Sequence, residues 1–130
     1  MRKVVMFLVI FVGLAAFRAP LVAHHGRGTT YESQKQIELK GTVGEVIWRN
    51  PHIGIMLDVK DANGTVVRWA IEHSNISTLA RQGYGRTTLK AGQELTAVVN
   101  PGTGGTLVGL CVKIILPDGK EIFQRGAGVD

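Results

Sequence analysis

The sequence lacks the motifs of a nucleophilic enzyme, and it contains almost no cysteine. Cys111 is the only cysteine among 130 residues, so an internal disulfide is excluded. None of the serines lies in a Gly-x-Ser-x-Gly frame, and no glycine-rich phosphate loop precedes a helical pattern. Cys111 lies within an apolar run, which is more typical of a buried small side chain than of a reactive thiol. We therefore predict that the protein is not an enzyme.

Acidic residues are missing from the first 23 positions, which have the composition of an export signal. Arg2 and Lys3 precede fourteen apolar or small residues at positions 4–17. This run fits a signal sequence and is shorter than the ~20 residues that a membrane span needs. Ala23 offers a cleavage site, so residues 1–23 are predicted to be a signal peptide, with an uncleaved anchor as the alternative. The mature protein is then periplasmic or secreted, without a stable membrane span.

Residues 24–130, which follow the predicted signal, also lack a large net charge. The whole chain has a formal net charge of +5, but residues 24–130 hold 12 basic against 10 acidic side chains. Binding to nucleic-acid phosphates requires many more lysines and arginines, so nucleic acid is not an expected partner. The remaining ~100 residues can bury one core and are too few for two domains.

Short apolar runs and many glycines predict a small β-rich fold. Strands are expected at 37–48, 53–59, 65–73, 94–100 and 106–116, followed by a short extended piece at 121–124. Gly41 and Gly44 lie where the apolar residues of the first strand change phase, which predicts a bulge or bend there. A helix of about two turns is expected after Ser74 or Asn75, which can cap it, and it should end near Gly83.

The pairing of the second and third strands can be predicted from their apolar faces. Alignment of these faces places Val59 opposite Val67 and Ile55 opposite Ile71. This register leaves a three-residue loop at 62–64, in which Gly64 occupies the position that favours a left-handed backbone. The pattern and the turn chemistry therefore predict the same hairpin.

Three strands, a short helix and two further strands form the element order of an OB-fold. We predict a mainly β protein, a five-stranded OB-fold-like Greek-key barrel at 37–124 with one short helix between strands 3 and 4. Residues 24–36 are expected to form an extended or loose N-terminal arm, and residues 125–130 a disordered tail. Because OB-folds bind oligonucleotides, saccharides, proteins and ions, the fold does not select a function.

Several short motifs together resemble one known family. They are His24-His25-Gly26, Leu39-Lys40-Gly41-Thr42-Val43, Trp48-Arg49-Asn50-Pro51-His52, Leu57-Asp58-Val59, Trp69-Ala70-Ile71-Glu72, Gly83-Tyr84, Leu89-Lys90-Ala91-Gly92 and Leu116-Pro117-Asp118-Gly119-Lys120. The chain resembles the small exported bacterial proteins classed as domain of unknown function 6152. The resemblance implies a secreted β-barrel and cleavage directly before His24, and it supplies no activity. Members usually continue after His-His with Ser-Phe and an acidic stretch, where this chain has Gly26-Arg27-Gly28-Thr29-Thr30.

Histidine is the residue type with the clearest chemistry. If cleavage follows Ala23, His24 has a free α-amine, and the amine and ring nitrogens can bind one divalent ion together. A further imidazole would complete a site suited to Cu(II), and imidazole also suits zinc and nickel. We predict His24, His25 and His52 as metal ligands and Cu(II) as the cofactor, and without copper no cofactor is expected.

Asn50, Glu72 and His73 are predicted either as further ligands or as side chains that orient the ligands. The hairpin register places Glu72 diagonally beside His52 on one face, and His73 on the other face. Each residue also has a structural interpretation. Asn50 and His52 can brace a turn, His73 can be a partly buried histidine at a strand end, and His24-His25 can be an ordinary exposed terminus.

Two hypotheses of other classes stand beside a copper-binding protein. One is an OB-type interaction module that recognises a protein, a saccharide or a small molecule without metal. The other is an accessory subunit of an enzyme encoded elsewhere. The interaction module predicts an exposed apolar or aromatic patch, whereas Trp48 and Trp69 are expected in the core or at the barrel rim. The expected partner is an unknown envelope protein or a small ligand.

Overall fold

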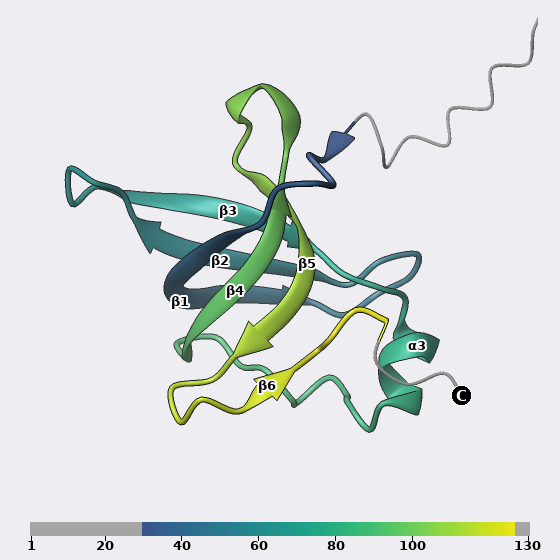
Figure 1. The fold of residues 1–130 in the computed structure, drawn as a ribbon. Helices are drawn as coiled ribbons and strands as arrows, with labels where there is room; N and C mark the ends of the chain where they lie inside the picture. The colour runs from purple at the N-terminus through teal and green to yellow at the C-terminus, as the bar shows by residue number, and fades with distance from the viewer. Residues whose placement is uncertain (1–29, 127–130) are drawn as a thin grey trace, which may run out of the picture.

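Five strands close into a barrel in the computed structural model, which describes residues 30–126 (Figure 1). They are β1 (Ile37–Ile47), β2 (Gly54–Lys60), β3 (Val66–Glu72), β4 (Glu94–Pro101) and β5 (Val108–Ile115). Neighbouring strands follow the order β3-β2-β1-β4-β5, and β3 also pairs with β5 in parallel, which closes the barrel. The short strand β6 (Glu121–Ile122) pairs with β5 outside the barrel. The predicted OB-fold-like Greek-key barrel is therefore confirmed.

Strand β1 belongs to both halves of the barrel. Its first part pairs with β4 and its second part with β2, and the register shifts between Val43 and Glu45. This shift is a β-bulge at Gly44, as the change of apolar phase predicted. At Gly41 a Cβ atom would lie 2.4 Å from the backbone oxygen of Asp58, so only glycine permits this close approach of β1 and β2.

The β2–β3 hairpin has the register that the sequence predicts. Val59 lies opposite Val67, and Ile55 lies opposite Ile71. Gly64 adopts a φ of 80°, the left-handed conformation that the three-residue loop requires. The local pattern was sufficient here because apolar alternation and turn chemistry specify the same pairing.

The segment between β3 and β4 contains the predicted helix, α3 (Ile76–Arg81). Asn75 caps it, because the Asn75 side chain accepts a hydrogen bond of 2.8 Å from the Thr78 amide. Gly83 follows the helix with a φ of 84°, and Leu79 is fully buried. A short 3-10 turn, η1 (Thr103–Gly105), lies in the β4–β5 loop. No helix in the described part of the chain is long and apolar enough to cross a membrane.

The hydrophobic core consists mostly of aliphatic side chains, to which every barrel strand contributes. Its buried members are Leu39, Val43, Ile53, Ile55, Leu57, Ile71, Leu79, Leu89, Leu95, Ala97, Val99, Cys111, Ile114, Ile122 and Phe123. Cys111 is a buried free thiol, as predicted, and its burial raises its pKa to about 12. Trp48 and Trp69 are partly buried and pack against this core. The tryptophans therefore contribute to packing at the edge of the core.

The C-terminal segment departs from the expected extended piece at 121–124. Only Glu121–Ile122 is a strand, since Phe123 leaves it with a φ of 53°, and the Phe123 side chain is fully buried. The ring of Phe123 packs edge-on against Tyr84, with centroids 4.8 Å apart. The chain turns at this point because the Phe123 side chain fills the core. In a continuing strand, the side chains of Ile122 and Phe123 would point to opposite faces, and they could not both be buried in the core.

Candidate functional site

His52 and Glu72 are brought together on the outer face of the barrel. His52 lies in the β1–β2 loop, and Glu72 is the last residue of β3, opposite Gly54. The His52 Nε2 atom lies 3.6 Å from Glu72 Oε1, and the two side chains are 40% and 31% exposed. This is the diagonal neighbourhood that the hairpin register predicts. The pair offers an imidazole nitrogen and a carboxylate oxygen to the same region of solvent.

Tyr31 joins this pair from the N-terminal arm. Its hydroxyl donates a hydrogen bond of 3.1 Å to Glu72 Oε2, so His52 and Tyr31 approach different oxygens of one carboxylate. Tyr31 is itself buried, with 7% of its surface exposed, and it forms an isolated β-bridge with Gly102. The arm therefore contacts the barrel surface directly beside His52 and Glu72.

These residues line a shallow hollow of about 260 Å³, which we call the His52 hollow. Its lining is Tyr31, His52, Ile53, Gly54, Met56, Ala70, Ile71, Glu72 and Val108. Gly54 and Ala70 are small, which leaves space between the larger side chains. The hollow lies over β2 and β3, between the β1–β2 loop and the start of β5. OB-folds bind their ligands on this face.

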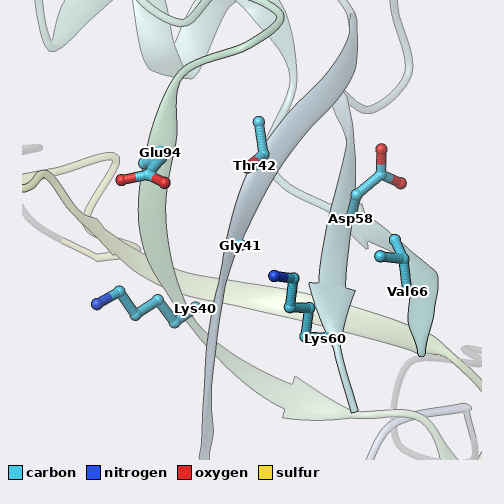
Figure 2. A pocket seen from close by; sticks show the side chains of 7 residues that line it. All are labelled: Lys40, Gly41, Thr42, Asp58, Lys60, Val66 and Glu94. Atoms are coloured by element: carbon cyan, nitrogen blue, oxygen red, sulfur yellow. The ribbon is translucent and has the colours of Figure 1, made fainter. Parts of the chain in front are cut away.

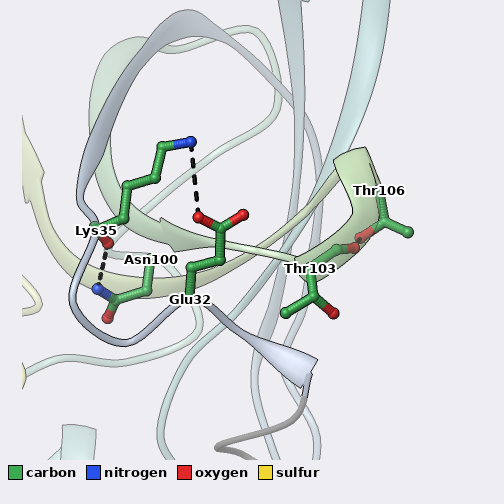
Figure 3. A network of polar contacts seen from close by, with 5 residues as sticks. All are labelled: Glu32, Lys35, Asn100, Thr103 and Thr106. Carbon is green, nitrogen blue, oxygen red and sulfur yellow. Dashed lines mark hydrogen bonds and ion pairs between the residues drawn. The ribbon is translucent and has the colours of Figure 1, made fainter.

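The arm is fixed to the barrel by the buried side chain of Asn100. Asn100 Nδ2 donates to the backbone oxygen of Lys35 at 2.6 Å (Figure 3). It also donates to the backbone oxygen of Ser33 at 3.3 Å. The Glu32 amide donates to the Pro101 oxygen at 2.9 Å. The described part of the arm, residues 30–36, is therefore held against the end of β4. It is not loose.

Arg125 reaches the same asparagine from the other end of the chain. Its guanidinium donates to Asn100 Oδ1 at 2.6 Å, and its amide donates to the Val112 oxygen at 2.7 Å. Arg125, expected to begin a disordered tail, is thus held in place, and residues 127–130 lie outside the described residues. Asn100 ties the arm and the C-terminal segment together, so we call Asn100, Lys35 and Arg125 the Asn100 clamp.

His73 does not join His52 and Glu72. It is 2% exposed, its Nε2 atom lies 2.7 Å from the Phe123 oxygen, and its Nδ1 atom accepts a 2.6 Å hydrogen bond from the Ser74 amide. Because the amide must donate, Nδ1 is the acceptor and Nε2 donates to the carbonyl. This geometry matches the structural interpretation of His73, which holds the C-terminal segment against the end of β3.

Asn50 braces the loop that holds His52. Its Oδ1 atom accepts a hydrogen bond of 3.3 Å from the Ile76 amide at the start of α3, and the Asn50-Pro51 peptide bond is cis. Asn50 does not line the His52 hollow. Its role in the structure is therefore to link the β1–β2 loop to α3.

The predicted ligands His24 and His25 lie outside the described residues. Within residues 30–126, no group of three or more histidine, cysteine, aspartate or glutamate side chains is placed to hold a metal ion. His52 and Glu72 supply two donors. A metal site that includes them needs a donor of another type, or one from residues outside this range.

A second, larger hollow lies on the outer surface toward the hairpin end of β2, and we call it the lysine hollow. Its volume is about 460 Å³, and its lining is Lys40, Gly41, Thr42, Asp58, Lys60, Val66 and Glu94 (Figure 2). Asp58 is held by Arg68, which donates to its two oxygens at 2.7 and 2.8 Å and lowers the pKa of the carboxyl. The hollow contains no histidine, and its charges are of both signs.

Sequence reasoning missed Tyr31, Met56 and Asn100. Tyr31 and Asn100 act across 41 and 65 residues of sequence, so no local pattern indicates their partners. The alternation of β2 could have placed Met56 on the outer face with Asp58. Its position in a hollow depends on Val108, which the closing β3–β5 pairing brings in.

Comparison with known proteins identifies one family. The model described as Family of unknown function (DUF6152) matches residues 12–112, which is more than half of the chain. No curated protein and no solved structure matches the chain.

Proposed function

We propose that this protein, which belongs to the family of unknown function DUF6152, is a non-catalytic metal-binding protein of the cell envelope. Copper is the metal that we propose first. His24, His25 and His52 are the proposed ligands. Glu72, which lies beside His52, is a further ligand or the group that orients His52. The proposed location is the periplasm or the exterior of the cell, after cleavage before His24.

The observation behind this proposal is that the arm contacts the barrel surface next to the His52–Glu72 pair. Tyr31 is bonded to Glu72, and His25 precedes Tyr31 by only six residues. A chain spans at most ~3.3–3.6 Å per residue, so His25 must lie within roughly 20 Å of Tyr31. The length of the arm thus permits the proposed N-terminal ligands to reach His52, which is the one exposed histidine within residues 30–126.

The donor set suits copper for a chemical reason. An N-terminal histidine supplies an amine and an imidazole nitrogen, and His52 adds a second ring. Tetragonal sites of nitrogen and oxygen donors favour Cu(II), which also binds such sites more tightly than other divalent ions of its row. Glu72 beside His52 resembles the carboxylate–histidine pairs that orient metal-binding imidazoles.

The test is Cu(II) affinity of the full mature protein, measured by competition with a chelator of known affinity. We expect His24→Ala and His52→Gln each to weaken binding by about 10–100-fold, which is the usual scale for groups that hold or orient a metal. Asp58→Asn is the matched control, because Asp58 is a paired carboxylate on the same outer face, outside the His52 hollow. Equal affinities for the wild type and for His52→Gln would contradict the proposal.

An interaction module that needs no metal is the second candidate. The lysine hollow favours it, because this surface combines charges with Val66, whose side chain is 59% exposed. Val66 and Leu107 are the exposed large hydrophobic residues of the described chain, and neither is aromatic. In this case Lys60→Glu should weaken capture of an envelope partner in the presence of a chelator, and His52→Gln should not.

A further inference from the structure

We infer that Met56 supplies a thioether donor to the His52 hollow, so that this hollow accepts Cu(I) as well as Cu(II). This inference rests on the proposed copper function and extends it to the oxidation state of the metal. It follows from where β2 places its only sulfur-containing side chain.

Met56 lines the His52 hollow together with His52, Glu72 and Tyr31. It lies two residues after Gly54, on the same outward face of β2, and opposite Ala70. Its terminal methyl carbon lies 3.8 Å from the position that a Gly54 Cβ would occupy. The Met56 side chain therefore extends back over Gly54, which is the residue that pairs with Glu72.

The small residues around Met56 leave its side chain accessible from the hollow. Gly54 and Ala70 contribute little bulk to the floor, and Ile47 packs on the same face of Gly54 as Met56 without lining the hollow. Methionine is unbranched and flexible, so its sulfur can move within the hollow at little cost. A partly exposed methionine that lines the same hollow as a histidine and a carboxylate thus adds a soft donor to two harder ones.

The combination of donors matters for copper in particular. Thioether sulfur selects Cu(I), imidazole binds both oxidation states, and carboxylate or amine donors favour Cu(II). Zinc and nickel gain little from a thioether, so Met56 would raise the preference of the site for copper over these ions. The proposal concerns binding alone and includes no electron transfer.

The sequence permits an unusually direct measurement. Met56 is the only methionine after residue 6, so methyl-labelled methionine gives a single NMR signal in a chain that begins at His24. We expect that signal to shift when one equivalent of Cu(I) is added under anaerobic, reducing conditions. We also expect Met56→Leu to weaken Cu(I) binding by at least about 10-fold and to leave Cu(II) binding nearly unchanged.

Ile47→Leu is the matched control, since Ile47 packs on the same glycine and has no sulfur. It should leave the affinity for both ions unchanged. A protein that binds Cu(II), but whose methyl signal and Cu(I) affinity are insensitive to Met56, would overturn the inference and leave the proposed function standing. Failure of the wild type to bind either ion would overturn both.

Discussion

At the scale of single residues, Glu72 connects the features that define the candidate site. One of its carboxylate oxygens faces His52 and the other accepts the Tyr31 hydroxyl. The imidazole therefore has a fixed neighbour on the barrel, and the arm has a fixed contact at the same point. Removal of the Tyr31 hydroxyl should remove the contact between the arm and Glu72. The contact between the His52 imidazole and the Glu72 carboxylate should remain.

For Tyr31→Phe we expect a loss of about 0.5–1.5 kcal/mol in the free energy of unfolding, the usual net value of one hydrogen bond. The buried ring stays in place, so the loss should not be larger. We also expect weaker Cu(II) binding, since the arm loses its contact with Glu72. Chemical denaturation and the Cu(II) competition assay measure the two effects. A variant with full copper affinity would show that this contact does not position the arm for binding.

Cys111 allows a prediction for alkaline pH. Burial raises its pKa from an ordinary value of 9.0 to about 12. Between these values the unfolded chain loses the thiol proton and the folded chain keeps it, so stability falls as the pH rises from about 9 to 12. The slope from this one group is at most ~1.4 kcal/mol per pH unit.

Denaturation at several pH values tests this prediction. Cys111→Ala should lose stability less steeply over this range than the wild type, whatever its stability at neutral pH. The native thiol should also resist alkylation at pH 8 until the protein unfolds, because the thiolate is the reactive form. Rapid alkylation of the native protein would contradict the assigned burial.

At the scale of elements, the Asn100 clamp holds the two ends of the described chain at one buried amide. Asn100 is 1% exposed, and both the arm and Arg125 bond to its side chain. A buried polar group that loses its partner costs more than the net value of a hydrogen bond. The clamp should therefore stabilise the fold and also fix the route of the arm to the His52 hollow.

We expect Asn100→Ala to lower the free energy of unfolding by about 2–4 kcal/mol, because both the arm and Arg125 lose their hydrogen bonds to this buried side chain. Arg125→Gln is the matched control, since it removes only the bond from the C-terminal side. It should destabilise the protein less and leave the arm bonded to Asn100. Hydrogen exchange at Glu32 and Lys35 reports on the arm, and equal exchange rates in both variants would contradict the clamp.

Sequence reasoning was most successful for individual strands, their pairing and the helix cap. The β2–β3 register, the bulge at Gly44 and the Asn75 cap all depend on residues close together in the chain. The His52–Glu72 contact followed from the register as well. Tyr31 and Asn100 were missed because their partners are far away in the sequence, and they come together only when the arm packs on the folded barrel.

At the scale of the whole molecule, the barrel places the candidate site where OB-folds bind ligands. The β1–β2 loop and the end of β3 meet the start of β5 there, and the N-terminal arm enters beside them. The family assignment supplies no activity, so the function proposed here depends on the donors themselves. The central claim is that the exported chain begins at His24 and holds one copper ion.

Native mass spectrometry of the protein exported by its own signal tests this claim most directly. The mass before metal is added gives the first residue of the mature chain. After one equivalent of Cu(II), we predict a species that begins at His24 and retains a single copper ion through buffer exchange, and we predict loss of that ion in His52→Gln. A chain that begins elsewhere, or one that begins at His24 and retains no copper, would contradict the account.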